Sequence, residues 1–221
     1  MNEFLKSTDV IDWQHPDVVA RARSLASDCE GPVAIARRCF EWVRDEIKHS
    51  HDHGLQPVTC SASEVLRVGS GFCYAKSHLL AALLRANGIP TALCYQRLRC
   101  NDEGTVFCLH GLNAVHLPDF GWYRLDARGN RADVDAQFIP PQERLAFRPS
   151  LSGEGDVPGL FAEPLPVVVA ALRSHSTAAE LSKRLPDADL ATMKATLTCE
   201  AKLATVGDAE TLARLAADVA P

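Results

Sequence analysis

The amino-acid sequence predicts an α+β fold, in which helices and strands occupy separate stretches of the chain. Residues 16–86 carry apolar side chains at the three- and four-residue spacing of helices. Residues 91–126 instead alternate between apolar and polar side chains and are interrupted by turn residues. Helical patterns return from residue 166. This order of elements is typical of helices packed on an antiparallel sheet.

Composition excludes several kinds of partner. A net charge of −5 gives no electrostatic basis for binding nucleic acid or an anionic membrane. The longest apolar runs, at 79–84 and 167–172, are too short to span a bilayer. The first residues, MNEFLKSTDVIDW, lack a basic region followed by an apolar core, so we expect no secretory signal and a cytoplasmic protein. The eight cysteines are irregularly spaced without a CxxC pair, so we expect free thiols rather than disulfides.

Three helices are expected before the first cysteine motif. Pro16 suits the first turn of a helix over 16–28, and Gly31-Pro32 precedes a second over 32–48. Ser61 and Glu64 have capping-box spacing and predict the start of a short third helix. The predicted core face of the second helix comprises Val33, Ile35, Ala36, Cys39, Phe40, Val43 and Ile47.

The segment His49-Ser50-His51-Asp52-His53 resembles a metal-binding cluster by composition alone. Alternate spacing on a polar loop gives no fixed ligand geometry, and the sequence offers no second ligand set. We therefore expect a solvated loop and no resident metal. Adventitious binding of a metal by His49, His51 and His53 stays open as a minor alternative.

The segment from Gly69 to Pro90 is the candidate nucleophile region. Two glycines precede Cys73, which begins an apolar helix that ends at Gly88. The unpaired N–H groups and positive dipole end of a helix N-terminus favour thiolate, the nucleophilic form of cysteine. A buried, inert cysteine is the alternative, but glycines at 69 and 71 favour close approach of a ligand.

Three strands are expected next, over 91–98, 105–117 and 122–126, with turns at 101–104 and 118–121. The second turn makes a hairpin that brings His110 close to Asp126. An imidazole beside a carboxylate is oriented in one tautomer, so Cys73, His110 and Asp126 could act as nucleophile, base and orienting acid. Three competitors are less suited: His116 lies near the turn, His78 faces away from Cys73 on the helix, and Asp119 lies in the turn.

Two segments of the chain resemble a known family. GSGFCYAKSHLLAALLRANGIPTAL is similar to the nucleophile segment of the transglutaminase-like superfamily, and LHGLNAVHLPDFGWYRLDARGN resembles its histidine and aspartate segments. The likeness covers roughly residues 10–130 and implies a papain-like (transglutaminase-core) fold with Cys73, His110 and Asp126 as the catalytic residues. Two departures are Gly111-Leu112 after the histidine and Ala127-Arg128 after the aspartate.

The resemblance leaves parts of the site open. An oxyanion hole would use the backbone N–H of Cys73 and one side-chain donor, for which Gln56 and Trp42 are candidates, although Trp42 suits packing of its helix better than contact with a substrate. Candidates for lining the substrate are Phe72, Tyr74 and Arg128. Arg128 and Arg131 could contact an acidic substrate or form ordinary ion pairs.

The rest of the chain carries no recognisable chemistry. Residues 138–166 are rich in proline and glycine and predict an extended connection, draped over the core or bordering the active-site cleft. Helices are expected at about 166–174, 177–185, 187–205 and 208–219, and their alanine-rich faces suit close packing or a homodimer contact. The expected units are a catalytic core at 1–137, the connection at 138–166 and a C-terminal helical extension at 167–221.

The predicted function is acyl transfer from an amide or peptide carbonyl through a thioacyl enzyme, without a cofactor. The acceptor would be water or a small amine. The resemblance to small bacterial members, with no DxDxDG calcium loop in the sequence, favours a hydrolase or protease over a cross-linking transglutaminase. The alternative is a catalytically silent binding module that retains the fold.

Overall fold

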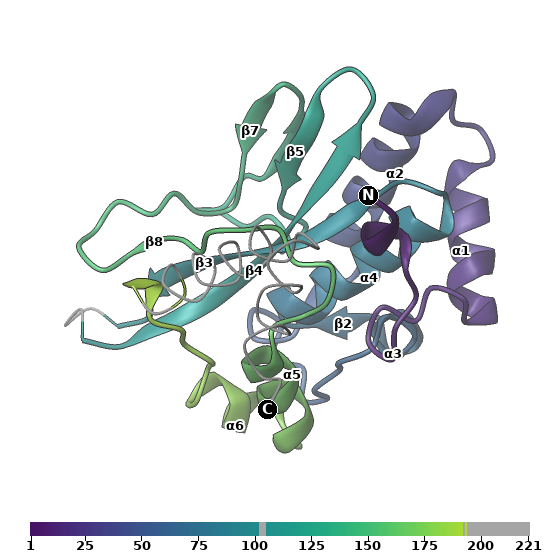
Figure 1. The fold of residues 1–221 in the computed structure, drawn as a ribbon. Coiled ribbons are helices and arrows are strands. Elements are labelled where there is room, and N and C mark those ends of the chain that lie inside the picture. The colour runs from purple at the N-terminus through teal and green to yellow at the C-terminus, as the bar shows by residue number, and fades with distance from the viewer. Residues whose placement is uncertain (102–104, 192, 194–221) are drawn as a thin grey trace, which may run out of the picture.

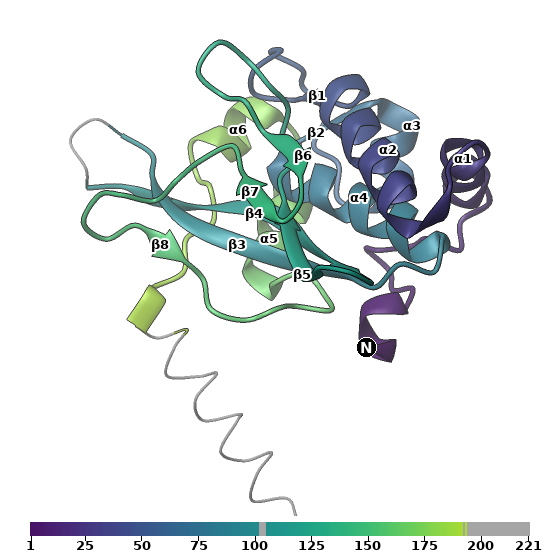
Figure 2. The same ribbon diagram turned by 90° about the horizontal axis from the view of Figure 1, so that it is seen from above.

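The computed structural model describes residues 1–101, 105–191 and 193 of the chain. Helix α4 (Cys73–Ala86) is central, and all but one of its residues are buried. Its neighbours on one side are α1 (Pro16–Ala26), α2 (Gly31–Glu46) and α3 (Ala62–Val68). The antiparallel sheet packs on its other side, as Figures 1 and 2 show. This arrangement confirms the predicted α+β, papain-like fold.

The sheet has the strand order β5-β4-β3-β8. Strands β3 (Thr91–Arg99) and β4 (Phe107–Leu117) pair along their lengths, and β5 (Gly121–Leu125) returns along β4 from a short turn. The predicted hairpin is therefore confirmed. The remaining elements are a 3-10 helix (Asn2–Leu5) and the short strands β1 (Lys48–His49), β2 (Ser70–Gly71), β6 (Gln137–Ile139), β7 (Gln142–Arg144) and β8 (Gly155–Asp156).

The local signals of the first helices are present in the structure. Ser61 accepts from the backbone N–H of Glu64, whose side chain accepts in return, so the predicted capping box is confirmed. Gly69 then ends α3 with φ of +74°, a conformation that glycine adopts without strain. Of the predicted face of α2, Ala36, Cys39, Phe40 and Val43 are fully buried. The helices thus supply one side of a continuous core.

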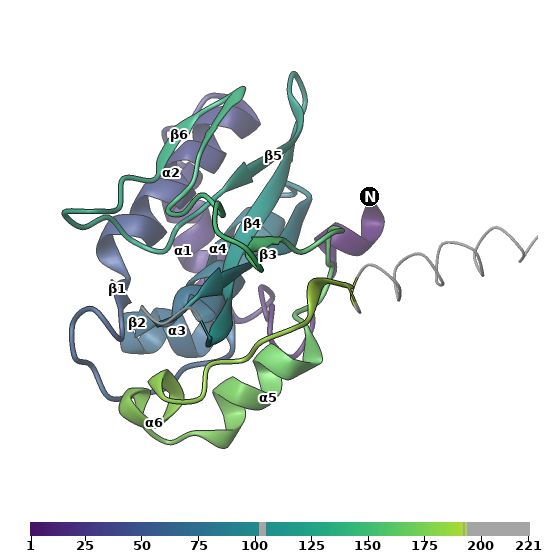
Figure 3. The same ribbon diagram turned by 90° about the vertical axis from the view of Figure 1, so that its left-hand side faces the viewer.

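Two helices follow the proline-rich connection. Helices α5 (Pro166–Ser174) and α6 (Ala178–Ser182) lie at the opposite end of the molecule from β5 and β6 (Figure 3). Val168 and Leu172 of α5 and Leu181 of α6 are buried in the main core. The predicted helix at 208–219, most of that at 187–205 and residues 102–104 of the first turn lie outside the described residues. No described helix is long and apolar enough to cross a membrane.

The expectation that all cysteines are free is wrong for one pair. Cys100 and Cys108, at the facing ends of β3 and β4, form a disulfide. The two strands pair in register, with Leu98 opposite Cys108. Pairing over this length brings the two thiols together, although their spacing in the sequence does not predict a disulfide. In the part of the chain that the structure describes, the other cysteines are free: Cys29, Cys39, Cys60, Cys73 and Cys94.

Candidate active site

Cys73 is the first residue of α4. Phe72 is the N-cap residue and makes no side-chain capping bond, so no side chain at this position satisfies the first N–H groups of the helix. The backbone N–H of Gly111 on β4 lies 3.5 Å from the Cys73 sulfur and donates to it. The cysteine is 8% exposed. These donors and the helix dipole all favour the thiolate.

A glycine allows β4 to approach the nucleophile helix. A Cβ at Gly111 would lie 3.0 Å from both Cα and Cδ1 of Tyr74, closer than side chains normally pack. Tyr74 also donates from its hydroxyl to the carbonyl of Leu109 on the same strand. Gly111 and Tyr74 thus hold β4 against α4 and bring His110 beside Cys73. The family departure at Gly111 therefore has a packing role.

His110 is oriented by Asp126, which directly follows β5. Nε2 of His110 lies 2.7 Å from Oδ2 of Asp126, whose side chain is completely buried. The carboxylate also accepts from the backbone N–H groups of Ala146 at 3.1 Å and Arg128 at 3.2 Å. Because Nε2 is engaged with the acid, Nδ1 is the ring nitrogen left to exchange a proton with the Cys73 thiol.

The electrostatics of the three groups support one another. Burial by itself would raise the pKa of Cys73, but the charge and hydrogen bonds of His110 and His49 lower it to about 6. Burial would likewise lower the pKa of His110, yet the charges of Asp126 and Cys73 raise it to about 10. The pKa of Asp126 is lowered in spite of burial, by His110 and by the two backbone donors. The site therefore favours a thiolate–imidazolium pair.

The proline-rich connection borders this site. The ring of Phe147 packs edge-on against His110 with 4.9 Å between ring centroids. Ala146 donates to Asp126, so this segment also fixes the acid. The guanidinium of Arg128 lies over the Phe147 ring, at 5.5 Å from its centroid. The connection thus closes one wall around the imidazole.

The predicted substrate-lining residues have internal partners. Phe72 is buried and packs against the His49 ring at 5.7 Å. Tyr74 is buried under Gly111. Arg128 makes a two-pronged ion pair with Asp52, at 2.6 and 2.9 Å, and Arg131 contacts the same carboxylate at 3.2 Å. Both arginines therefore form ion pairs within the protein, the second of the two possibilities that the sequence left open.

The contacts described for the other predicted candidates are with groups other than the Cys73 thiol. The Gln56 side chain is exposed and donates to the carbonyl of Gly54 at 3.5 Å. Trp42 packs on the core and carries the guanidinium of Arg21 at 4.8 Å from its ring. His78 is buried with Nδ1 2.8 Å from the carbonyl of Cys60, and burial lowers its pKa to about 4. The remaining two, His116 and Asp119, lie beside Trp122 and in the exposed turn respectively.

The expectation that His49 lies on a solvated loop is wrong. His49 is 7% exposed, and its ring packs on Phe72, the residue before Cys73, where it helps to lower the pKa of the Cys73 thiol. It belongs to β1, which pairs in parallel with β2 so that His49 lies opposite Gly71. A parallel pair of two-residue strands has no sequence signature, which is why the pattern of residues 49–53 did not indicate it. His51 and His53 are exposed, as expected.

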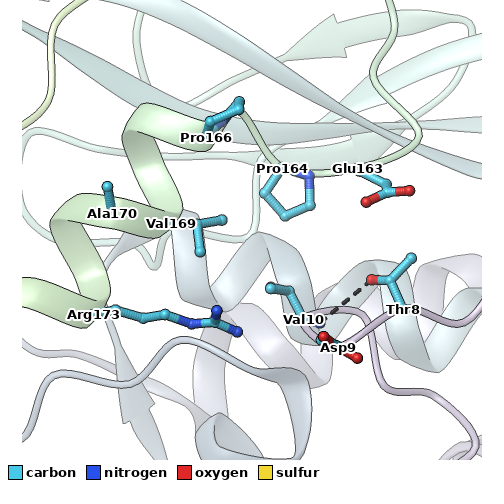
Figure 4. A pocket seen from close by; sticks show the side chains of 9 residues that line it. All are labelled: Thr8, Asp9, Val10, Glu163, Pro164, Pro166, Val169, Ala170 and Arg173. Carbon is cyan, nitrogen blue, oxygen red and sulfur yellow. Dashed lines mark hydrogen bonds between the residues drawn. The ribbon is translucent and has the colours of Figure 1, made fainter.

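The cavities described next are not lined by Cys73, His110 or Asp126. One of about 660 Å³ lies between residues 8–10 and the start of α5, with Arg173 at one end (Figure 4). Another, of about 210 Å³, reaches the edge of the site, because His49, Asp52 and Lys76 are among its lining residues. Within the described part of the chain, no group of three or more His, Cys, Asp or Glu side chains is arranged to hold a metal ion.

Comparisons with known proteins agree with this architecture. A family model described as the transglutaminase-like superfamily matches residues 19–127, which include Cys73, His110 and Asp126. No curated protein matches the chain.

Solved structures with similar folds include a putative cysteine protease from Cytophaga hutchinsonii, with 18% identity and a TM-score of 0.47 over 57% of this chain and 40% of that one. The periplasmic domain of TgpA from Pseudomonas aeruginosa has 22% identity and a TM-score of 0.41 over 56% and 45% of the two chains. The match thus spans less than half the length of these proteins. The family model therefore places residues 19–127 of the chain in the transglutaminase-like superfamily.

Proposed function

We propose that this protein is a cysteine-nucleophile enzyme that acts on amide or peptide carbonyls through a thioacyl intermediate. Cys73 is the nucleophile, His110 the general base and acid, and Asp126 the residue that orients the imidazole. The supporting observation is a thiol at a helix N-terminus beside an imidazole whose Nε2 lies 2.7 Å from a buried carboxylate. Nucleophile, base and orienting acid in this order form the general arrangement for acyl transfer.

Acylation begins with the thiolate of Cys73 and the imidazolium of His110. The sulfur attacks the carbonyl carbon, and the electron pair of the C=O bond moves to oxygen. When this pair returns, the C–N bond breaks, and Nδ1 of His110 gives its proton to the departing amine. A thioester on Cys73 and a neutral imidazole remain. Asp126 keeps the ring orientation throughout and stabilises its protonated form.

Deacylation regenerates the thiolate. His110 takes a proton from water or an amine, which attacks the thioester carbonyl and expels the Cys73 sulfur. Water gives a carboxylic acid and an amine gives a new amide. Hydrolysis is the proposed outcome, with peptides or protein amides as the substrate class. The sequence contains no DxDxDG calcium loop, which sets the chain apart from acyltransferases that bind calcium through such a loop.

The test uses iodoacetamide, which alkylates thiolates without needing a known substrate. At pH 7 we expect Cys73 to be alkylated before Cys29, Cys39, Cys60 and Cys94, as quantified by peptide mass spectrometry. Replacing His110 by Ala should remove this preference, whereas His116→Ala, on the same strand beside Trp122, should leave it unchanged. Cys73→Ala should abolish hydrolysis of a fluorogenic peptide library.

The contrary result is equally clear. Uniform alkylation of the free cysteines, together with no hydrolysis of any peptide or ester, would identify a catalytically silent binding module with this fold. Addition of a primary amine to a reaction that does proceed separates the two acceptors. An amide product in place of the acid would reverse the assignment as a hydrolase and leave the nucleophile in place.

A further inference from the structure

A second imidazole, that of His49, lies beside the residues that lead into Cys73. Backbone bonds from Lys48 to Gly69 and from Ser50 to Gly71, of 3.0 and 3.1 Å, fix β1 against β2, two residues before Cys73. His49 lies between these bonds. Its ring is buried against Phe72, the residue before Cys73, and it is near enough to the thiol to help lower its pKa.

The His49 ring has its own acidic partner. Nδ1 lies 3.5 Å from Oδ1 of Asp52, an ion-pair distance, and Nε2 is the other nitrogen of the ring. Asp52 is in turn held by Arg128 and Arg131. Burial raises the pKa of Asp52, but hydrogen bonds from His49 and Arg128 bring it far below its usual range, so the carboxylate is ionised at neutral pH.

We propose that His49 is a second catalytic residue of this site, a hydrogen-bond donor to the oxygen on which negative charge develops when Cys73 attacks a carbonyl, and that Asp52 is its positioning residue. The inference rests on the proposed acyl-transfer function. In the step, Nε2–H of His49 and the backbone N–H of Cys73 hold the oxyanion until its electron pair re-forms the C=O bond. His49 keeps its proton, while His110 carries the transferred one.

The two histidines differ in ways that suit these separate roles. Asp126 pairs with one imidazole, that of His110, at 2.7 Å. This pairing supports a base whose charge changes during the reaction. Asp52 is shared by His49, Arg128 and Arg131, which fixes the carboxylate in place. A donor that holds a developing charge needs a fixed position rather than a changing charge.

The experiment compares two reactions of the same sulfur. Alkylation by iodoacetamide forms no oxyanion, whereas acylation by p-nitrophenyl acetate does. For His49→Ala we expect the acylation rate, measured as the p-nitrophenol burst, to fall by about 10²–10³-fold, the usual effect of losing one oxyanion donor. The maximal alkylation rate of Cys73 at high pH should change only a few-fold. His49→Gln retains an N–H donor and should recover at least tenfold in acylation.

Controls separate this inference from the function on which it rests. His51→Ala alters the exposed neighbour that contacts Ser182 and should leave both rates unchanged. Asp52→Asn should lower acylation more than alkylation. Equal losses in both reactions for His49→Ala, or no gain from His49→Gln, would overturn the oxyanion role. Failure of the proposed function itself would appear differently, as an absence of any burst in the parent protein.

Discussion

Two histidine–carboxylate pairs lie near Cys73, and they are held in place by different kinds of secondary structure. His110 and Asp126 are held by the long antiparallel pairing of β4 and β5, and their contact is 2.7 Å in a fully buried setting. His49 and Asp52 come from a two-residue strand and the loop after it, with a contact of 3.5 Å and a carboxylate that is 16% exposed. An extended sheet therefore produces the tighter pair.

The largest effect should come from breaking each pair at its carboxylate. Asp126→Asn removes the charge that stabilises the His110 imidazolium, so acylation by p-nitrophenyl acetate should fall by about 10²–10⁴-fold. In Asp52→Asn, His49 is positioned less firmly, so the acylation rate should fall only about tenfold. This is a small part of the effect of losing an oxyanion donor. The comparison of the pairs would fail if Asp52→Asn were as damaging as Asp126→Asn in burst kinetics of folded protein.

A second prediction concerns the charge state that the pairs impose on the thiol. The pKa of Cys73 is lowered to about 6, whereas burial raises that of Cys39 and of Cys94 to about 12. A lowered thiol pKa means that thiolate forms at lower pH. The rate of Cys73 alkylation should therefore rise through about pH 6 and be level by pH 8.

The same titration distinguishes the contributions of the two histidines. His110→Ala removes the larger favourable interaction and should move the inflection upward by more than His49→Ala does. Rates followed for each cysteine by mass spectrometry between pH 5 and pH 10 provide the measurement. An inflection near the ordinary thiol pKa of 9.0 in the parent protein would contradict the thiolate–imidazolium pair.

The close approach of β4 to α4 gives the third prediction. Gly111→Ala puts a methyl group 3.0 Å from Tyr74 backbone and ring atoms, which are fixed in the core. Stability to urea should fall by about 1–3 kcal/mol, the usual cost of overpacking, and acylation should fall with it because His110 is displaced. Gly155→Ala on β8 of the same sheet is the control, since its methyl group meets only the flexible end of Leu190. A neutral Gly111→Ala would contradict the packing argument.

The contrast between the pairs also explains what the sequence could reveal. The apolar spacing after Cys73, the alternation around His110 and the turn before Asp126 are local patterns, and they predict both the elements and their mutual placement. His49 reaches the site through a parallel contact between segments some twenty residues apart in the chain. The pairing of Cys100 with Cys108 depends in the same way on the register of long strands. Such contacts are decided by tertiary packing and carry no local signature.

The smallest effect should come from the support beneath the His49 strand. Lys76, one turn after Cys73 on α4, is buried and donates to the carbonyls of Ile47 and Arg44 at the end of α2. Lys76→Met keeps much of the side-chain volume but leaves these carbonyls without a donor, which should cost about 1–3 kcal/mol of stability to urea. Lys48→Met, at an exposed residue that donates to Asp45, is the matched control and should cost less.

Loss of the Lys76 contacts should also affect the two histidine–carboxylate pairs differently, and this difference can be measured in acylation and alkylation. Because Lys76 holds the chain just before His49, its loss should loosen that imidazole. His110 is held by strand β4 and should stay in place. Acylation by p-nitrophenyl acetate should therefore fall a few-fold in the Lys76→Met variant, while the alkylation inflection of Cys73 stays near that of the parent. If instead the inflection moved as far as it does in His110→Ala, the two sides of the site would be mechanically coupled, and the independence of the two pairs would be disproved.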